Sequence, residues 1–282
     1  MRIIRTPSTI RLLFLSALLF IISSCSPYQK LLKSDDVELK FEKAIEYYEA
    51  ESYGRAIGLL NDIIPVFRGS ARAELLNYYY AMAHYKQRDY ILASHYFRTF
   101  ATSFPRSEHV EEFLFLSAYC KYLESPRHSL DQTSTREAIS ELQAFINRFP
   151  NSERVEEANT LIDELRLKLE TKRFEAGILY FNLASYTAAV TTFDSFIRDF
   201  PDTRYREEAL FYIIRAHYEF ADQSIPARQI ERFERVVESY RRLERFFPES
   251  QFMTQASRMK DTATSRIEVL QASLQEETTE NQ

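Results

Sequence analysis

Hydrophobic positions along the chain recur in a stripe that repeats five times. Each copy starts at a small residue, continues with hydrophobic residues four and seven positions later, and ends eleven positions later at a phenylalanine. The five small residues are Ala56, Ala93, Ala138, Ala189 and Val236, and the five phenylalanines are Phe67, Phe104, Phe149, Phe200 and Phe247. This i, i+4, i+7, i+11 spacing lies on one face of an α-helix, so each copy predicts an amphipathic helix that ends at its phenylalanine.

A helix-breaking signal follows each stripe. Four of the phenylalanines precede a proline, whereas the first copy has Arg68 in that place. A serine or threonine three residues after each phenylalanine stands where a helix N-cap belongs, and in four copies a glutamate follows in the first turn. Sixteen residues after each phenylalanine comes a further mostly small residue: Ala83, Cys120, Leu165, Ala216 or Ala263. Each repeat therefore predicts two antiparallel helices.

Recurring helix pairs are typical of tetratricopeptide repeats, which stack into an α-solenoid with a concave groove. We therefore predict an all-α fold of five tetratricopeptide-like helix pairs with a C-terminal capping helix. The predicted pairs span about 37–67, 71–104, 108–149, 153–200 and 204–247, and the cap spans about 251–275. Insertions at 124–134 and roughly 222–228, and a long first helix in the fourth pair, explain why the spacing between phenylalanines varies from 37 to 51 residues. The polar tail 276–282 is expected to be disordered.

The N-terminus has the pattern of a secretory signal peptide. Three arginines precede an apolar run, Leu12 to Ile22, which is too short to span a bilayer comfortably. The motif Ile22-Ser23-Ser24-Cys25 resembles the lipobox of bacterial lipoproteins, which implies cleavage before Cys25 and acylation of that residue. We predict a signal peptide at 1–24 and a lipidated N-terminus and linker at 25–36, with about ten flexible residues. The alternative is a cysteine that happens to lie near an ordinary cleavage site.

Composition narrows the classes of function. The chain has four glycines and no tryptophan, but 18 tyrosines and 22 phenylalanines, which suits closely packed helices. Loss of the signal peptide removes three arginines and no acid, so the net charge moves from -5 to -8. Without a basic block, nucleic acid is not an expected partner, and membrane contact should come from the lipid. Only Cys120 accompanies Cys25, so packing rather than an internal disulfide must stabilise the mature chain.

The sequence contains no constellation of residues typical of a catalytic or metal site. The five histidines form no pair at helical spacing, and no glycine-rich phosphate loop or nucleophile elbow is present. We therefore predict a protein that is not an enzyme and that carries no metal or cofactor beyond the covalent lipid. Acidic pairs such as Glu111-Glu112 are better explained as first-turn charges than as catalytic dyads. Cys120 shares its repeat position with alanines, which favours a small buried contact over a redox thiol.

Tyrosines crowd the second repeat and are the main candidates for binding. Tyr78, Tyr80 and Tyr96 lie off the predicted core stripe, and Tyr53 holds an aromatic position just before the first stripe. Such rings can present a rigid amphipathic surface to a bound segment. We expect these four tyrosines to line a substrate groove. The alternative is that they only pack between repeats.

A family resemblance emerges from several of these features together. The insertion carrying Asp131-Gln132-Thr133, the motif Phe149-Pro150-Asn151-Ser152, the long fourth-repeat helix and the run 196–203 resemble the BamD family. Members are five-repeat lipoproteins of the outer-membrane β-barrel assembly machine, the BAM complex. The resemblance covers nearly the whole chain.

The resemblance implies a palmitate-bearing lipoprotein on the periplasmic face of the outer membrane. It implies that the C-terminal repeats bind a BamA-type barrel-forming subunit, and that the N-terminal repeats receive unfolded outer-membrane proteins for membrane insertion. From repeat geometry, the partner-binding candidates are Arg204, Arg206, Arg241 and Arg242. Another envelope repeat lipoprotein, either Tol-linked or coordinating cell-wall enzymes, remains an alternative, as does a glycan-binding lipoprotein.

Overall fold

The computed structural model describes residues 26–280, with side chains from 27 to 275. Within this part of the chain there are twelve helices and no strand, which confirms the all-α prediction. The predicted signal peptide and the lipidation residue Cys25 lie outside the described residues. None of the helices in the described part combines the length and apolarity needed to cross a membrane.

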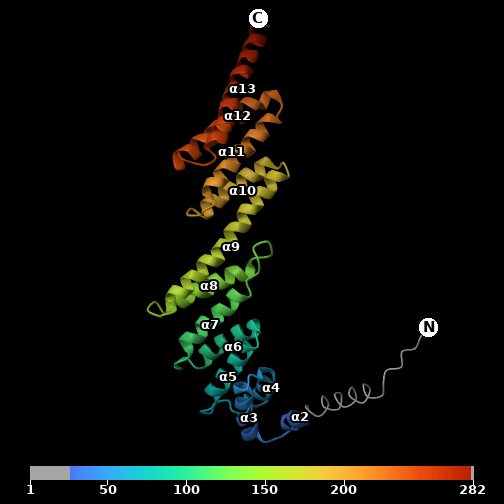
Figure 1. The fold of residues 1–282 in the computed structure, drawn as a ribbon, viewed down its shortest axis with the longest axis vertical. Coiled ribbons are helices and arrows are strands. Elements are labelled where there is room, and N and C mark those ends of the chain that lie inside the picture. The colour runs from blue at the N-terminus through green and yellow to red at the C-terminus, as the bar shows by residue number, and fades with distance from the viewer. Residues whose placement is uncertain (1–25, 281–282) are drawn as a thin grey trace, which may run out of the picture. The chain divides into compact units, whose positions relative to one another are not determined.

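Ten of the helices form five consecutive antiparallel pairs (Figure 1). The pairs are α3 (Val37–Glu49) with α4 (Tyr53–Ile63), α5 (Ala73–Lys86) with α6 (Tyr90–Ser103), α7 (Val110–Leu123) with α8 (Thr133–Arg148), α9 (Val155–Asn182) with α10 (Tyr186–Asp199), and α11 (Arg206–Asp222) with α12 (Pro226–Phe246). A short helix, α2 (Ser26–Leu32), precedes them, and α13 (Met253–Glu280) follows as the cap. The fold is the predicted series of tetratricopeptide-like pairs.

The chain divides into two compact units. Unit 1 contains the described residues up to 125 together with 133–162, and unit 2 contains 126–132 together with the residues from 163 onward. The helix α9 therefore begins in unit 1 and continues in unit 2. Each unit has a hydrophobic core of its own.

The repeated stripe forms these cores. The five small residues that begin the stripes are all 0% exposed, as are the residues sixteen positions after each phenylalanine. Phe97, Phe193 and Leu243, which belong to the same stripes, are also completely buried. The helix faces predicted from the spacing are therefore the faces that pack.

Hydroxyl side chains close the turn before five of the helices. Ser70, Ser107, Ser152, Thr203 and Ser250 each accept a hydrogen bond from the backbone N–H two residues later, at 3.1 to 3.2 Å. The regular helix starts one residue beyond that N–H, so these residues cap a preceding turn rather than the first helical residue itself. The recurring glutamates do lie in the first helical turns.

Two terminal segments differ from expectation. The segment expected to be a flexible linker contains α2, and α13 continues to Glu280, beyond the predicted end of the cap at 275. The disordered tail expected from position 276 is therefore helical up to Glu280. Polarity predicts disorder only for the tail 276–282. In the structure α2 is held by contacts with α4, and the first half of α13 packs against the core of unit 2, from which the helix continues to Glu280.

The insertion that carries the Asp131-Gln132-Thr133 motif is ordered by its glutamine. Gln132 is 1% exposed, and its amide Nε2 donates to the backbone carbonyls of Arg127, at 2.9 Å, and Leu130, at 3.1 Å. The Lys172 ammonium also donates to the Leu130 carbonyl. The motif thus has a structural role within unit 2, because it closes the insertion 126–132 on itself.

Candidate interaction surfaces

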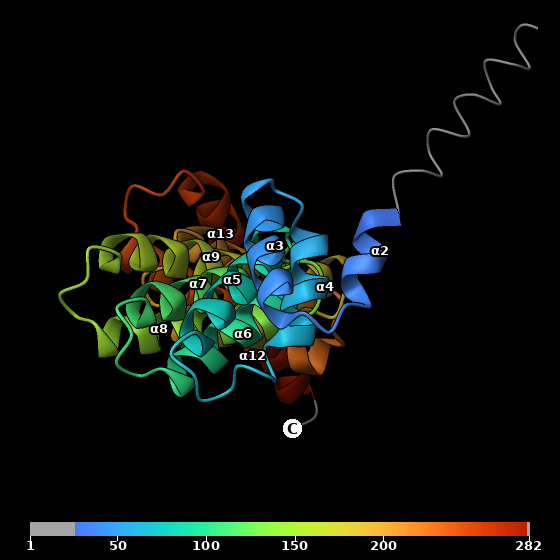
Figure 2. The ribbon, with the colours of Figure 1, turned by 90° about the horizontal axis from the view of Figure 1, so that it is seen from below.

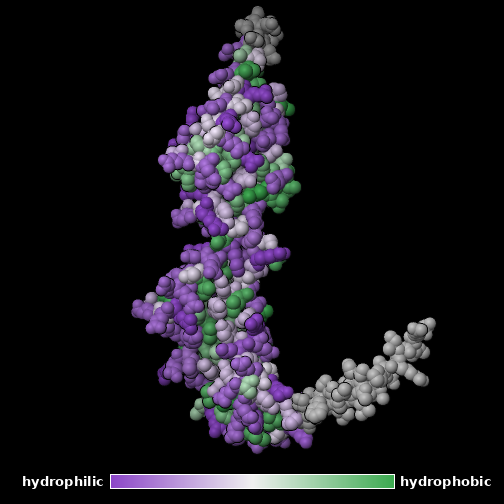
Figure 3. All heavy atoms as spheres, in the orientation of Figure 1, coloured by the Kyte–Doolittle hydropathy of each residue, from purple (hydrophilic) through white to green (hydrophobic). Residues whose placement is uncertain are grey.

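A row of partly buried tyrosines runs over α3, the start of α4, α5 and α7. The row consists of Tyr48, Tyr53, Tyr78, Tyr79, Tyr85, Tyr119 and Tyr122, and we call it the tyrosine row. Its first members are in ring contact: Tyr53 lies 5.5 Å from Tyr48, Tyr48 lies 4.9 Å from Tyr79, and Tyr79 lies 5.6 Å from Tyr78, measured between ring centroids. On the face of unit 1 drawn in Figure 3, hydrophobic residues form a narrow strip bordered by hydrophilic ones.

The row continues onto α7. Tyr119 and Tyr122 are stacked there, with ring centroids 5.7 Å apart and planes 15° from parallel. Burial raises the pKa of Tyr48 to about 12, and burial also raises the pKa values of Tyr78 and Tyr85. Their hydroxyls are therefore neutral at physiological pH and can donate hydrogen bonds. The sequence prediction missed the α7 members, although Tyr122 lies one 37-residue repeat after Tyr85.

The four tyrosines expected to line one groove fall into two groups. Tyr53 and Tyr78 belong to the tyrosine row. Tyr80 is only 8% exposed, and its ring contacts Tyr96 at 4.6 Å and His84 at 4.8 Å. The prediction that Tyr80 stands off the core is wrong, because this ring fills the space between α5 and α6. For Tyr80, the packing alternative fits the structure better.

The buried group around Tyr80 is polar as well as aromatic. The Tyr80 hydroxyl lies 3.4 Å from both the Tyr96 hydroxyl and the Asn61 Oδ1, and His84 Nδ1 lies 3.2 Å from Asp89 Oδ2. Burial lowers the pKa of His84, against the smaller opposing effect of Asp89. The neutral imidazole is therefore the favoured form at pH 7.

An arginine sits at the α7 end of the tyrosine row. The Arg154 guanidinium lies 4.8 Å from the Phe115 ring centroid and donates to both Glu112, at 3.2 Å, and Glu157, at 2.8 Å. Phe115 stacks in turn on Tyr119, with ring centroids 6.0 Å apart. This cation is already paired, so the row offers a bound segment aromatic faces and hydroxyls rather than unpaired charge.

The four partner-binding arginines lie in unit 2 and differ in how firmly they are held. Arg206 donates to the Pro201 carbonyl at 2.7 Å and covers the ring of Phe246, and Arg242 pairs with Asp194. Arg204 is exposed and donates to the neighbouring Tyr205 hydroxyl at 2.8 Å. Arg241 is exposed on α12. Of the four, Arg241 and Arg204 are the most accessible to a partner.

Further arginines on α12 enlarge this charged surface. One hollow of about 460 Å³ between α10, α11 and α12 is lined by Arg228, Arg232 and Arg235 with a single acid, Glu231. A second hollow of about 560 Å³ is lined by Arg235, Arg241, Arg242 and Arg245 with Asp194 and Glu238. Arg228, Arg232 and Arg235 stand at i, i+4 and i+7, and this spacing is the sequence signal that places them on one helix face.

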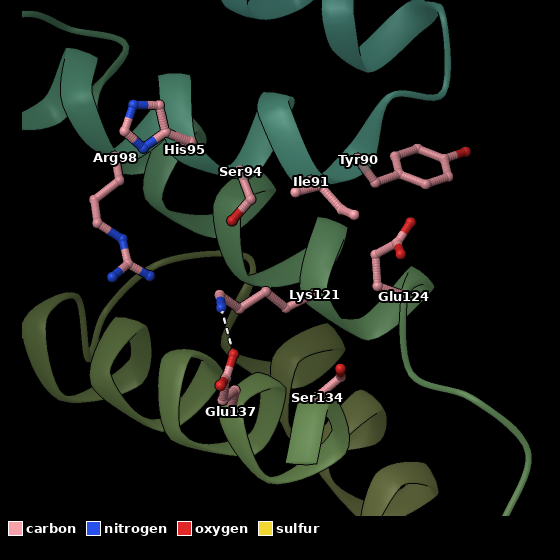
Figure 4. Close-up of a pocket in the computed structure, with 9 residues that line it drawn as sticks. All are labelled: Tyr90, Ile91, Ser94, His95, Arg98, Lys121, Glu124, Ser134 and Glu137. Atoms are coloured by element: carbon pink, nitrogen blue, oxygen red, sulfur yellow. Dashed lines mark hydrogen bonds and ion pairs between the residues drawn. The ribbon is translucent and has the colours of Figure 1, made fainter. Parts of the chain in front are cut away.

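The corresponding hollow in unit 1 has balanced charges. It measures about 360 Å³ and lies between α6, α7 and α8 (Figure 4). Lys121 Nζ pairs with Glu137 Oε2 at 2.7 Å across it, and Arg98 pairs with Glu141. Excess positive charge is therefore a feature of the α12 hollows and not of this one.

No arrangement in the described part of the chain resembles a metal centre. Among residues 26–280, no group of three or more histidine, cysteine, aspartate or glutamate side chains is placed to hold an ion. Cys120 is fully buried, and burial raises the pKa of its thiol to about 12. A thiol in this state is inert, which agrees with a packing role for Cys120.

Comparison with known families then identifies the chain. The YfiO family model, described as "Outer membrane lipoprotein", matches residues 34–233, well over half of the 282 residues. The chain belongs to this family. The matched region runs from just before α3 into α12, so it contains both the tyrosine row and the first α12 arginines.

Curated relatives of this YfiO-family chain carry one name, "Outer membrane protein assembly factor BamD". The protein from Caulobacter vibrioides is 24% identical over 184 residues, covering 64% of this chain and 59% of the relative. That from Pasteurella multocida is 23% identical, covering 70% and 79%, and that from Neisseria meningitidis serogroup A is 25% identical, covering 78% and 82%. The chain thus spans less than two thirds of the Caulobacter protein.

Two solved structures are also similar to this family member. The tetratricopeptide domain of P58(IPK) matches with a TM-score of 0.39 and 13% identity, covering 85% of this chain and 68% of that one. The TPR2AB domain of yeast Sti1 matches with a TM-score of 0.38 and 12% identity, covering 81% and 98%.

Proposed function

We propose that this chain is a non-enzymatic, lipid-anchored subunit of the outer-membrane β-barrel assembly machine. Membership of the outer membrane lipoprotein family and the shared BamD name of its relatives support this role. In this proposal acylated Cys25 holds the protein on the periplasmic face of the outer membrane. The repeats then bind unfolded outer-membrane proteins and a BamA-type barrel subunit.

The observation that carries the substrate role is the tyrosine row. Unfolded β-barrel proteins present extended segments with alternating aromatic and polar side chains, and these suit a surface of amphipathic rings. Seven partly buried tyrosines over the four helices α3, α4, α5 and α7 supply such a surface. Because the rings are already packed against one another, little side-chain entropy is lost when a segment binds.

Substitution of the row tests the substrate role. We expect Tyr119→Ala combined with Tyr122→Ala to weaken binding of a fluorescent peptide from an unfolded β-barrel protein at least fivefold, since two stacked faces are lost. Tyr180→Ala is the matched control, because Tyr180 is 42% exposed and lies in unit 2. Equal affinity of the double variant and the parent, with circular dichroism showing both folded, would contradict the role of the row.

The α12 arginines support binding of the barrel subunit. They concentrate positive charge at two hollows, which favours a partner segment rich in carboxylates. We expect Arg241→Glu to weaken capture of a purified periplasmic region of the barrel subunit at least tenfold, and more strongly at low salt. Arg198→Glu is the control, because the Arg198 side chain is 75% exposed on α10 and lines neither hollow. Loss of capture in both variants would reject a specific site and indicate general charge attraction.

A further inference from the structure

The short helix α2 is held in place by unit 1. A helix of seven residues is too short to be stable in water by itself. Its Tyr28 hydroxyl donates to the Arg55 carbonyl at 3.1 Å, and the Tyr28 ring meets the Tyr47 ring edge-on at 5.6 Å. Leu31 and Leu32 pack with the core residues of unit 1. Figure 2 shows α2 alongside α4, as these contacts require.

A glycine on α4 makes room for this contact. A Cβ atom at Gly58 would lie 2.3 Å from the Tyr28 hydroxyl oxygen and 4.0 Å from Leu32 Cδ2. Glycine inside a helix is less favourable than alanine by about 1 kcal/mol, so its presence here is explained by the close approach of α2. The other glycine of α4, Gly54, has no comparable neighbour, since its nearest side-chain atoms, on Gln87, are 3.9 Å away.

Docking of α2 shortens the connection between the N-terminal cysteine and the repeats. If residues 26–36 were extended, they could span at most about 36–40 Å. As a helix, α2 is about 10 Å long, and its third residue, Tyr28, is already fixed to α4. A group attached to Cys25 is therefore within a few residues of the surface of unit 1.

We propose that the docked helix α2 holds the α2–α4 end of unit 1 against the phospholipid headgroups of the membrane. This inference rests on the acylation of Cys25 in the proposed function. Acyl chains inserted in the bilayer place Cys25 at the headgroup level, and the fixed α2 then brings Arg55 and the rings beneath it to the same level. The Arg55 guanidinium is exposed, 5.7 Å from the Tyr28 ring centroid and 5.5 Å from that of Tyr47. Arginine over tyrosine suits a lipid surface, because the guanidinium pairs with phosphate while the rings lie at the apolar boundary.

The test measures the distance of unit 1 from the membrane. The acylated protein is reconstituted into vesicles of phosphatidylethanolamine and phosphatidylglycerol with nitroxide-labelled headgroups. A fluorophore is attached through Gly54→Cys on α4 or, for comparison, through Gln143→Cys on α8. The buried Cys120 thiol does not compete for the label. We expect headgroup nitroxides to quench the fluorophore at position 54 at least twice as strongly as the one at 143.

Undocking variants give the decisive comparison. Tyr28→Ala with Leu32→Ala removes the contacts of α2, and Gly58→Ala blocks them from the α4 side. We expect each to lower the quenching at position 54 at least twofold and to abolish amide-exchange protection in α2, while the circular dichroism of the repeats stays unchanged. Adding Tyr28→Phe to Gly58→Ala removes the clashing oxygen and should restore part of the quenching.

The outcomes separate this inference from the proposed function. Mass spectrometry of the N-terminal peptide reports acylation of Cys25, and an unacylated chain would overturn the anchor and this inference together. An acylated chain in which undocking leaves the quenching at position 54 unchanged would overturn this inference alone. Equal quenching at 54 and 143 in the parent would also overturn it.

Discussion

A single methyl group at Gly177 should destabilise unit 2. Gly177 lies on α9, and a Cβ atom there would be 2.5, 2.6 and 2.8 Å from three ring atoms of Phe193 on α10. The Phe193 ring cannot move away easily, because it is 0% exposed and contacts Phe174 at 5.7 Å and Tyr212 at 5.5 Å. Overpacking of this kind costs about 1–3 kcal/mol, against a gain of up to about 1 kcal/mol in helix propensity. We expect Gly177→Ala to lower the free energy of unfolding of unit 2 by about 1–2 kcal/mol.

Amide exchange of the soluble chain lacking residues 1–25 measures this free energy in each unit. Gly54→Ala is the matched control in unit 1, because a Cβ there meets nothing closer than 3.9 Å. We expect it to stabilise α4 by about 0.5–1 kcal/mol through helix propensity alone. A double-mutant cycle adds Phe193→Leu, after which Gly177→Ala should become nearly neutral. If Gly177→Ala proves as stable as the parent without this second change, the packing of α9 against α10 described above is wrong.

Three further results are expected. Since burial raises the pKa of Cys120 to about 12, its thiol should resist a disulfide reagent at pH 8 in the folded chain and react fully in urea. Rapid reaction in the native state would show that Cys120 is accessible and contradict its burial. Burial lowers the pKa values of His84 and His217 below the usual 6.5, so as the pH drops below about 6.5 the unfolded chain binds protons before the folded chain does, and stability should fall. Replacing both histidines with glutamine should flatten the decrease in Tm between pH 7 and pH 5. An unchanged slope would show that these histidines do not cause the decrease. Lys40 is 5% exposed and pairs with Asp62. Asp62→Ala should therefore lower the free energy of unfolding, measured in urea, by about 1–2 kcal/mol, because it leaves a buried charge without its partner. Combining Asp62→Ala with Lys40→Met should recover most of that loss.

The repeat architecture could be predicted from the sequence because it depends on local spacing. A small residue at one helix crossing and a hydrophobic residue four positions later share one helix face in every copy, as Ala93 with Phe97 and Ala189 with Phe193 illustrate. Hydroxyl residues mark all five turns, and prolines mark four of them. The period varies with the insertions, but the packed face of each helix does not.

Features that depend on tertiary contact could not be predicted in this way. The sequence of α2 is too short to indicate a helix, and its contacts with α3 and α4, to which Gly58 gives room, explain why it forms. Tyr80 lies next to Tyr78 and Tyr79 in sequence, yet it turns towards Asn61 and Tyr96 and is buried. Neighbours on a helix point about 100° apart, so which tyrosines reach the surface depends on how the pairs stack.

The most direct test of the proposed role is depletion of this protein in its own cells, followed by quantification of outer-membrane β-barrel proteins and affinity purification of the acylated chain. The account predicts that β-barrel levels fall before other envelope components change, and that a large barrel-forming subunit is recovered with the chain. It also predicts that a copy carrying Tyr119→Ala and Tyr122→Ala restores those levels poorly while still recovering the barrel subunit. Normal β-barrel levels after depletion, with cell-wall enzymes recovered in place of a barrel subunit, would contradict it.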